Sequence, residues 1–254
     1  MTYHINPAYG EMAELIKLVP PHKYTPEHVY CNRRNTVERV SVGDRRFVVK
    51  KYRRPTVANQ IIYTFFRKNK AQRAFEYALR LKLNDVDTAA PVAYITENKG
   101  GIFHTGWFIC EYLPYDTLSS RLRDARDEKE TGRLLDSYIR FTAELHSKGI
   151  YHKDYNPGNI LVNTVDGRDN FALIDINQMK FGHSPGIFRS SVSFVQCDLP
   201  MSEKVRNVSR YAEIRHFPPA LCRMSCYLYE AICTFRRTLK FPFKQLRKAL
   251  HRLR

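Results

Sequence analysis

The segment "HKDYNPGN", residues 152–159, sets a His, an Asp and two Asn around a Pro-Gly pair, directly before the apolar run "ILV". It follows an amphipathic segment that ends at Gly149, and glycine is the residue that most often terminates a helix. Polar and turn-forming residues in front of a strand suit a plain surface loop, and they also suit a loop that handles phosphate and a metal ion.

The spacing of these polar residues favours the second interpretation. His152, Asp154 and Asn159 form the pattern H-x-D-x-x-x-x-N, which is typical of a kinase catalytic loop. Asp154 would accept the proton of an attacking hydroxyl, and Asn159 would offer a side-chain oxygen to Mg²⁺, which binds through oxygen and needs few protein ligands beside phosphate. His152 is expected to fix the loop.

A second metal ligand is expected at the end of the next hairpin. The segment "FALIDIN", residues 171–177, displays Asp175 after an apolar run, sixteen residues beyond Asn159. Kinases carry the triplet D-F-G at this place, and here the triplet is Asp-Ile-Asn. Asp175 is therefore the predicted partner of Asn159 in holding magnesium.

A kinase also needs a lysine on a strand to hold the α- and β-phosphates of the nucleotide. The segment "FVVK", residues 47–50, ends an apolar strand with Lys50. Because side chains alternate along a strand, we expect Lys51 to point to the opposite face.

The helix that follows this strand should carry a glutamate that orients the lysine. Residues 45–84 contain twelve Lys and Arg and a single acidic residue, Glu76. We predict that Glu76 pairs with Lys50. The alternative is a surface pair with Arg73 or Arg80, which would contribute little stability.

The order of the predicted elements indicates an α+β, two-lobed, protein-kinase-like fold with a β-rich N-lobe and a mainly helical C-lobe. Hydrophobic periodicity predicts a β-hairpin over 29–52, helix over 57–83, a strand pair over 91–113, a helix over 131–149 and a second hairpin over 159–175.

The lobes are predicted as 1–113 and 114–254, because "LPYD" places a proline between a strand and a helix. Residues 1–25 are expected to be a loosely structured entry segment. Cys222, Cys226 and Cys233 share one helical face without the tight spacing of a zinc site, so we expect buried thiols.

The chain has 254 residues and a formal net charge of +17. Such an excess predicts a polyanionic partner, which could be a nucleic acid, an anionic membrane or a phosphorylated substrate. The N-terminus lacks the pattern of a signal peptide, and no run of apolar residues is long enough to span a bilayer. We therefore expect a cytoplasmic protein.

The basic charge is densest at the C-terminus. Residues 231–254 contain eight Lys and Arg, no acidic residue, and an apolar stripe at helical spacing. The stripe consists of Phe243, Leu246, Leu250 and Leu253. A basic helix of this kind suits an anionic membrane surface, although it could equally pack on the C-lobe with a solvated basic face. Nucleic acid is disfavoured because the stripe is mostly aliphatic.

Residues 45–181 resemble the lipopolysaccharide core kinase family, the Kdo and heptose kinases with a protein-kinase-like fold. The resemblance rests on "FVVKKYRRP", "KNKAQRAFEYALRLKLNDVDTAAPVAY", "HKDYNPGNILV" and "ALIDINQMKF". It implies ATP-dependent phosphorylation of a sugar hydroxyl in the inner core of lipopolysaccharide, at the cytoplasmic face of the inner membrane. The implied partners are the glycolipid substrate and the membrane surface.

The resemblance also assigns roles to single residues. It implies that Asp154 is the catalytic base, that Asn159 and Asp175 hold Mg²⁺, and that Glu76 orients Lys50 on the phosphates of ATP. The hinge that would meet adenine consists of Glu111, Tyr112 and Leu113.

Two departures keep other interpretations open. The segment "CNRRNTVERV", residues 31–40, contains no glycine where kinases have a glycine-rich loop, and Asn156 stands where many protein kinases carry a lysine. One alternative is an atypical protein kinase or small-molecule kinase of the RIO-like or aminoglycoside-kinase-like kind. Another is a pseudokinase that binds an anionic lipid.

Overall fold

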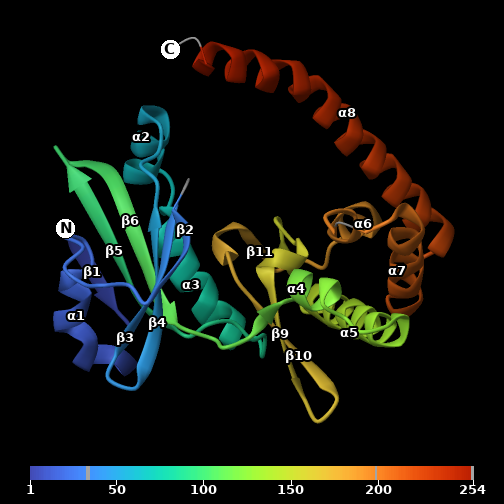
Figure 1. Cartoon of the computed structure of the whole chain (residues 1–254), viewed down its shortest axis with the longest axis horizontal. Coiled ribbons are helices and arrows are strands. Elements are labelled where there is room, and N and C mark those ends of the chain that lie inside the picture. Colours follow the sequence, from blue (N-terminus) through green and yellow to red (C-terminus); the bar gives the residue numbers. More distant parts are fainter. Residues whose placement is uncertain (33–34, 198, 253–254) are drawn as a thin grey trace. The chain divides into compact units, whose positions relative to one another are not determined.

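In a computed structural model the chain forms two compact units. Unit 1 comprises Met1–Leu118 and Asn159–Met179, and unit 2 comprises Ser119–Gly158 and Lys180–Arg254 (Figure 1). The predicted lobe boundary at residue 113 stays a prediction.

The structure describes residues 1–32, 35–197 and 199–252, and near the C-terminus it describes the backbone of α8 but not the side chains of 237 and 239–252. Arg33 and Arg34 belong to the glycine-free segment over 31–40, and they lie outside the described residues. Nearly all of the basic C-terminal side chains do so too.

Unit 1 is built on a six-stranded antiparallel sheet in the order β1-β5-β6-β4-β3-β2. The strands are β1 (Thr2–Ile5), β2 (His28–Asn32), β3 (Thr36–Val42), β4 (Arg45–Tyr52), β5 (Pro91–Lys99) and β6 (Ile102–Glu111). The expected strand hairpins are therefore present, and β4 lies inside the sheet between β3 and β6.

Strand alternation divides β4 between two environments. Phe47 and Val49 are 1% and 2% exposed and belong to a hydrophobic core on one face of the sheet. Val48 and Lys50 point to the other face, where they line a cavity. Lys51 returns to the first face, where its Nζ lies 5.3 Å from the centre of the Trp107 ring. The expected opposite orientation of the two neighbouring lysines is confirmed.

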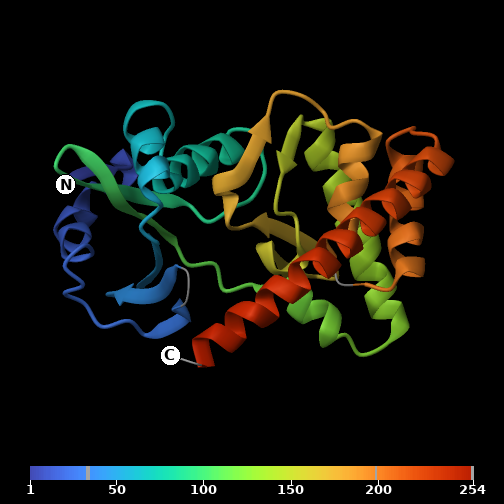
Figure 2. The same cartoon turned by 90° about the horizontal axis from the view of Figure 1, so that it is seen from above.

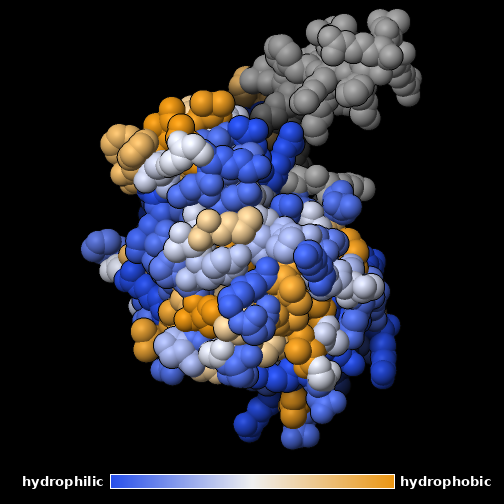
Figure 3. Space-filling model, turned by 90° about the vertical axis from the view of Figure 1, so that its left-hand side faces the viewer, coloured by the Kyte–Doolittle hydropathy of each residue, from blue (hydrophilic) through white to orange (hydrophobic). Residues whose placement is uncertain are grey.

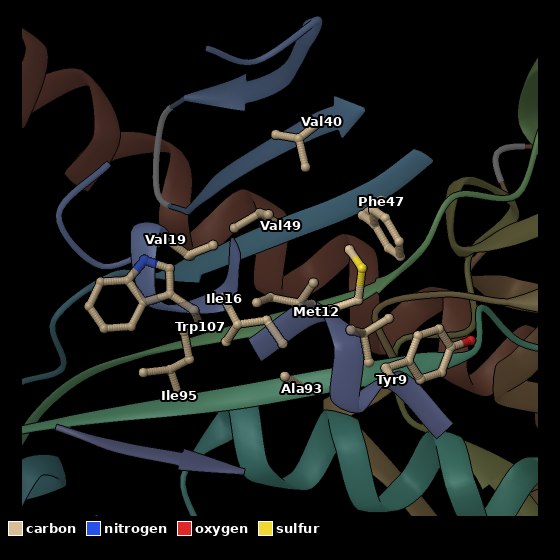
Figure 4. Packing of buried hydrophobic residues seen from close by; sticks show 12 residues of the cluster. Tyr9, Met12, Ile16, Val19, Val40, Phe47, Val49, Ala93, Ile95 and Trp107 are labelled. Atoms are coloured by element: carbon tan, nitrogen blue, oxygen red, sulfur yellow. The ribbon is translucent and has the colours of Figure 1, made fainter. Parts of the chain in front are cut away.

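The N-terminal segment is not loosely structured, and that expectation was wrong. Strand β1 pairs with β5, and the segment η1 (Pro7–Met12) with α1 (Ala13–Leu18) covers the core face of the sheet. Figure 4 shows Met12 and Ile16 among the side chains of the cluster. Apolar side chains four residues apart at these positions were the sequence signal, because they form one face of a helix.

The helical region after β4 consists of two helices, α2 (Val57–Phe65) and α3 (Lys70–Lys82). The break has a local cause: Asn69 is the N-cap of α3 and its side chain accepts a hydrogen bond from the Gln72 N–H at 3.0 Å. Helix α3 packs on β5 and β6 through a buried stripe. The stripe includes Ala71, Ala74, Ala78 and Leu81, whose spacing of three and four residues places them on one helical face.

A hairpin of β9 (Ile160–Val165) and β10 (Arg168–Leu173) completes unit 1, with the short strand β7 (Asp116–Thr117) beside β9. The single turn η3 (Ile176–Gln178) follows β10 and packs on α3. The hairpin is tied to the rest of the unit by Thr88, whose hydroxyl donates to the Leu173 carbonyl at 2.7 Å.

Unit 2 is mainly helical. Its elements are α4 (Leu118–Arg123), α5 (Glu128–Ser147), β8 (Ile150–His152), η2 (Pro157–Asn159), β11 (Met179–Phe181), α6 (Ile187–Val195), α7 (Met201–Ile214) and α8 (Pro219–Arg252). Helix α5 begins at the N-cap Asp127, and its buried stripe includes the predicted Leu134, Tyr138 and Leu145. Of the three thiols expected to be buried, Cys222 and Cys226 are buried in α8, whereas Cys233 is only partly buried.

Helix α8 continues as one ribbon well past α6 and α7, on which its first half packs (Figure 2). Its basic second half has the predicted helical backbone, but its side chains lie outside the described residues. Within the described part of the chain, every helix is too short or too polar to cross a lipid bilayer.

The core of unit 2 contains a buried histidine, which generates a prediction about pH. Burial, followed by the charge of Arg215, lowers the pKa of His146 to about 3. Its Nδ1 lies 2.8 Å from the Tyr211 hydroxyl. Unfolding returns this side chain to an ordinary pKa of about 6.5, so below that pH the unfolded state binds a proton that the native state does not.

The stabilising effect of a neutral His146 is therefore present above pH ~6.5 and is lost as the pH falls toward ~3. We expect the free energy of unfolding to fall with pH in this window, by up to about 1.4 kcal/mol per pH unit for this one group. Urea denaturation at several pH values measures the slope. His146→Phe should reduce it, whereas the exposed His183→Gln should not, and an unchanged slope in His146→Phe would contradict the assignment.

Candidate active site

Unit 1 contains a cavity of about 350 Å³ beside the second face of its sheet. Its walls come from β3, β4 and β6, from the chain that leaves β6, and from the β9–β10 hairpin with η3. The apolar part of the lining includes Val37, Val48, Ala89, Phe108, Leu161 and Ile174. Apolar walls with a few polar groups at one end are typical of a site for a small organic ligand.

Lys50 and Asp175 form an ion pair at the polar end of this cavity. The Lys50 Nζ lies 2.6 Å from Asp175 Oδ1, and the two side chains are 15% and 33% exposed. They are 125 residues apart in the chain, so the pair depends on the fold of the whole unit. An ion pair with restricted exposure is stronger than one on the open surface, because water screens it less.

Glu76 does not pair with Lys50 in this structure. Its carboxylate accepts hydrogen bonds from Lys68 Nζ at 2.7 and 2.8 Å and from Gln72 Nε2 at 3.1 Å. Lys50 instead uses Asp175, the partner that the sequence interpretation did not assign to it. The sequence contains a signal for this pairing, because Lys68 lies one residue before the N-cap of α3 and is therefore close to the first turns of that helix.

The hinge residues have distinct roles. The Glu111 N–H donates to the Ala90 carbonyl and the Tyr112 N–H donates to the Arg46 carbonyl, both at 2.9 Å. Within the part of the chain that the structure describes, the Leu113 N–H has no such partner. Leu113 also lines the cavity, so its backbone amide is the hinge donor that a ligand ring could use.

The predicted metal ligands lie on neighbouring segments of unit 1. The Ile174 N–H donates to the Asn159 carbonyl at 3.0 Å, and both Asn159 and Asp175 line the cavity. Asp175 has a φ of 52°, in the left-handed region that aspartate tolerates better than most residues. The Asn177 side chain donates to Asp175 Oδ1 at 2.5 Å and helps to hold the carboxylate.

This donor set fits a magnesium ion. It offers one carboxylate and one amide oxygen beside a cavity, and Mg²⁺ takes oxygen ligands while leaving the remaining positions to phosphate and water. Asn159 and Asp175 would hold the ion, which would neutralise charge on bound phosphates. The assignment of both residues stays a prediction.

The catalytic-loop segment belongs to unit 2 and has a well-defined local structure. His152 is 1% exposed, and its Nδ1 accepts a hydrogen bond from the Asp154 N–H at 3.1 Å. Tyr155 is buried with its hydroxyl 2.9 Å from the Thr142 hydroxyl on α5. His152 thus shapes the loop, as the sequence interpretation expected, and the loop is anchored on the helix before it.

Asn156 has a role that the sequence did not reveal. Its Nδ2 donates to Asp154 Oδ1 at 3.1 Å, and its Oδ1 accepts from the Gly158 N–H at 3.0 Å. One amide therefore orients the carboxylate of Asp154 and closes the turn that follows. The spacing of two residues between Asp and Asn was the available signal, since short polar side chains commonly bond within such turns.

Comparison with solved structures shows the fold. The chain is similar to WaaP as solved in complex with acyl carrier protein, with a TM-score of 0.60, 15% identity, and coverage of 87% of this chain and 91% of that one. A structure of the bifunctional kinase-methyltransferase WbdD also matches, with a TM-score of 0.47, 19% identity, and coverage of 89% and 46%. The α+β, protein-kinase-like fold predicted from the sequence is confirmed.

Residues 29–181, more than half of the chain, match the model of the lipopolysaccharide kinase (Kdo/WaaP) family. The chain belongs to this family, and the predicted resemblance and enzyme class, a phosphotransferase, are confirmed at the level of the family. A curated relative is the O-antigen chain terminator bifunctional methyltransferase/kinase WbdD of Escherichia coli, 35% identical over 75 residues. The match spans 30% of this chain and about a tenth of that protein.

The two lysines of β4 provide a matched test of the nucleotide site. Lys50→Met removes the cation that lines the cavity, and Lys51→Met removes a cation of the opposite face. We expect Lys50→Met to weaken binding of magnesium-ATP by about tenfold or more, because it removes a direct charge interaction with phosphate. Lys51→Met should bind as the unchanged chain does, with calorimetry as the measurement. Equal affinity in both variants would contradict the assignment of Lys50.

The contact of Asn156 with the Asp154 carboxylate can be tested separately from its contact with the turn. Asn156→Asp keeps an acceptor for the Gly158 N–H but loses the donor to Asp154. A hydrogen bond to a charged group contributes about 1.5–3 kcal/mol, so we expect kcat of phosphate transfer to fall roughly 10- to 100-fold. The KM for ATP and the melting temperature should stay close to those of the unchanged chain. A variant with full kcat would show that Asn156 does not position Asp154.

Proposed function

We propose that this chain is an ATP-dependent kinase that phosphorylates a sugar hydroxyl in the inner core of lipopolysaccharide. One observation carries the proposal: the region matched by the lipopolysaccharide kinase family, residues 29–181, contains every residue of the predicted site, from Lys50 to Asp175. Lys50 and Asp175 beside an apolar cavity support it, because a strand lysine for phosphate and an aspartate for metal are two groups that a kinase uses on its nucleotide.

In this proposal unit 1 binds the nucleotide. The apolar walls of the cavity hold the adenine ring, and the Leu113 N–H donates a hydrogen bond to its edge. Lys50 binds the α- and β-phosphate oxygens at the polar end. Glu76 serves to orient Lys50 when the lysine leaves Asp175 for the phosphates.

The chemical step is a transfer of the γ-phosphoryl group. An oxygen of the acceptor sugar attacks the γ-phosphorus, the bond from that phosphorus to the bridging oxygen breaks, and ADP leaves. Asp154 takes the proton of the attacking hydroxyl; His152 holds its backbone N–H, and Asn156 holds its carboxylate. When bound by Asn159 and Asp175, Mg²⁺ offsets the negative charge of the phosphates.

The acceptor lies on a membrane lipid, so we propose that the protein is cytoplasmic and peripheral on the inner membrane. The net charge of +17 supports this placement, since the inner leaflet is anionic. The basic C-terminal helix is one proposed contact with that surface. Nucleic acid remains a disfavoured partner, because the helix lacks an aromatic stripe.

Two other functions remain to be separated from this one. An atypical protein or small-molecule kinase would transfer phosphate to a soluble acceptor rather than to lipopolysaccharide. A pseudokinase would bind anionic lipid without transfer, and the glycine-free segment over 31–40 is the observation that favours it. Transfer of labelled phosphate from ATP to purified lipopolysaccharide, compared with a general protein acceptor, separates the first kinase from a protein kinase. A thermal-shift assay with magnesium-ATP separates the kinases from the pseudokinase, for which no shift is expected.

The catalytic assignment is tested with two aspartates of unit 2. Asp154→Ala removes the proposed base, and Asp136→Ala removes an exposed carboxylate on α5. Loss of a general base typically costs about 10²- to 10⁴-fold in rate, so the first variant should lose core phosphorylation and the second should not. Mass spectrometry of the lipid core from cells that carry each variant measures the outcome. A core that remains phosphorylated with Asp154→Ala as the sole copy would refute the assignment.

A further inference from the structure

Helix α2 directs polar side chains toward the protein and large apolar side chains toward solvent. Its inward side is formed by polar side chains: the Gln60 amide, 6% exposed, donates to the Pro55 carbonyl at 2.9 Å. The Thr64 hydroxyl accepts a hydrogen bond from the Phe103 N–H of β6 at 2.9 Å. Tyr63 adds an edge-on contact with the Phe103 ring at 5.6 Å. The helix thus contacts β6 through one hydrogen bond and one aromatic pair, and its buried amide bonds to the segment before it.

The outward side of α2 is apolar. Val57, Ile61 and Phe65, spaced four residues apart, are 68%, 41% and 69% exposed, and Ile62 and Phe66 extend the surface at 40% and 81%. We call these five residues the α2 apolar face. Figure 3 shows hydrophobic surface at its upper left, at the height at which Figure 1 draws α2. A cluster of large exposed apolar side chains is typical of a surface that binds a membrane or another protein.

Cations surround this face and acids are absent from its neighbourhood in the sequence. No Asp or Glu occurs between Asp44 and Glu76, and Arg53, Arg54 and Arg67 flank the helix. Among the described residues, no carboxylate pairs with any of these three arginines. The charge beside the α2 apolar face is therefore strongly positive and largely uncompensated.

Two of these arginines also line a hollow. A cavity of about 470 Å³ lies beside α2, and its lining includes Arg53, Arg54, Lys70 and the α2 side chain of Asn59. Guanidinium groups bind phosphate oxygens in pairs, which makes such a cavity suited to a phosphate-bearing headgroup. The apolar helix and the basic cavity share one edge of unit 1.

The charge decides between possible occupants. A second copy of the chain would bring the same positive surface to the contact, and like charges would oppose association. A nucleic acid would stack its bases on aromatic rings, whereas three of the five residues of the α2 apolar face are aliphatic and its two phenylalanines stand at one end. A helix with an exposed apolar face and neighbouring Arg and Lys is the pattern that lies in the interface of an anionic bilayer.

We propose that α2 docks unit 1 on an anionic phospholipid membrane. The α2 apolar face enters the boundary between headgroups and acyl chains, and Arg53 and Arg54 bind headgroup phosphates. This surface is distinct from the C-terminal helix. The proposal concerns binding alone, and it holds whether or not the chain transfers phosphate.

A fluorescent probe on α2 tests the proposal in the full-length chain and separates α2 from the C-terminal helix. The chain has a single tryptophan, Trp107, which is 3% exposed and gives a constant background. Phe65→Trp places a second indole on the α2 apolar face, and Leu83→Trp places one at an exposed position, 85% exposed, just after the far end of α3. The probes are vesicles of phosphatidylcholine with and without phosphatidylglycerol.

We expect the emission of Phe65→Trp to shift to shorter wavelength with the anionic vesicles, and that of Leu83→Trp to stay unchanged. Phe65→Ser combined with Phe66→Ser should lower the fraction of protein that floats with anionic vesicles by about tenfold or more. Leu83→Ser should float as the unchanged chain does. Arg53→Gln combined with Arg54→Gln should weaken binding and reduce its dependence on salt.

Three results would overturn the proposal. The first is a chain that does not float with anionic vesicles. The second is flotation without any emission shift in Phe65→Trp, which would assign docking to another surface such as the C-terminal helix. The third is an emission shift that depends on protein concentration and not on vesicles, which would make the α2 apolar face a contact between copies of the chain.

Discussion

The candidate site depends on the two-residue period of β4. Both edges of β4 are paired, with β3 and β6, and its two faces differ: Phe47 and Val49 fill the core under the N-terminal segment, and Val48 and Lys50 line the cavity. A shift of one residue would move Lys50 into the core and a valine into the cavity, so the packing of the core fixes the position of the lysine. The nucleotide site is in this sense a consequence of the core.

The same constraint explains why Lys50 meets Asp175. The strand fixes the lysine, and the β9–β10 hairpin is fixed independently by the Thr88 hydroxyl on the Leu173 carbonyl and by the Ile174 N–H on the Asn159 carbonyl. Asn159 and Asp175, the predicted metal ligands, thus lie at the end of the hairpin that these hydrogen bonds hold in place. Asp175 takes a left-handed backbone conformation there, which turns its carboxylate toward the cavity that Lys50 lines.

Much of the fold could be predicted from the sequence because its periodicities are local. The strand hairpins, α5 and the orientation of Lys50 and Lys51 follow from alternation and helical spacing. The entry segment is ordered by the same rule, because the spacing of Met12 and Ile16 places both on one helical face toward the core. The partner of Glu76 and the bond from Asn156 to Asp154 were not predictable in the same way, because several cations surround Glu76 and only coordinates say which one it contacts.

The pairing of Glu76 with Lys68 leaves its predicted role open on energetic grounds. Lys68 is 58% exposed and Glu76 34%, and an exposed ion pair contributes only about 0–1 kcal/mol. Lys50 is more deeply buried and holds a carboxylate that nucleotide phosphates and Mg²⁺ would engage in turn. If a metal ion engaged Asp175 and phosphate engaged Lys50, the ion pair between these two side chains would break. Glu76 would then give up only its weak surface pair with Lys68 to become the partner of Lys50. Such an exchange of partners would be driven by the ligand, and one set of side chains would then serve both a nucleotide-free and a nucleotide-bound site.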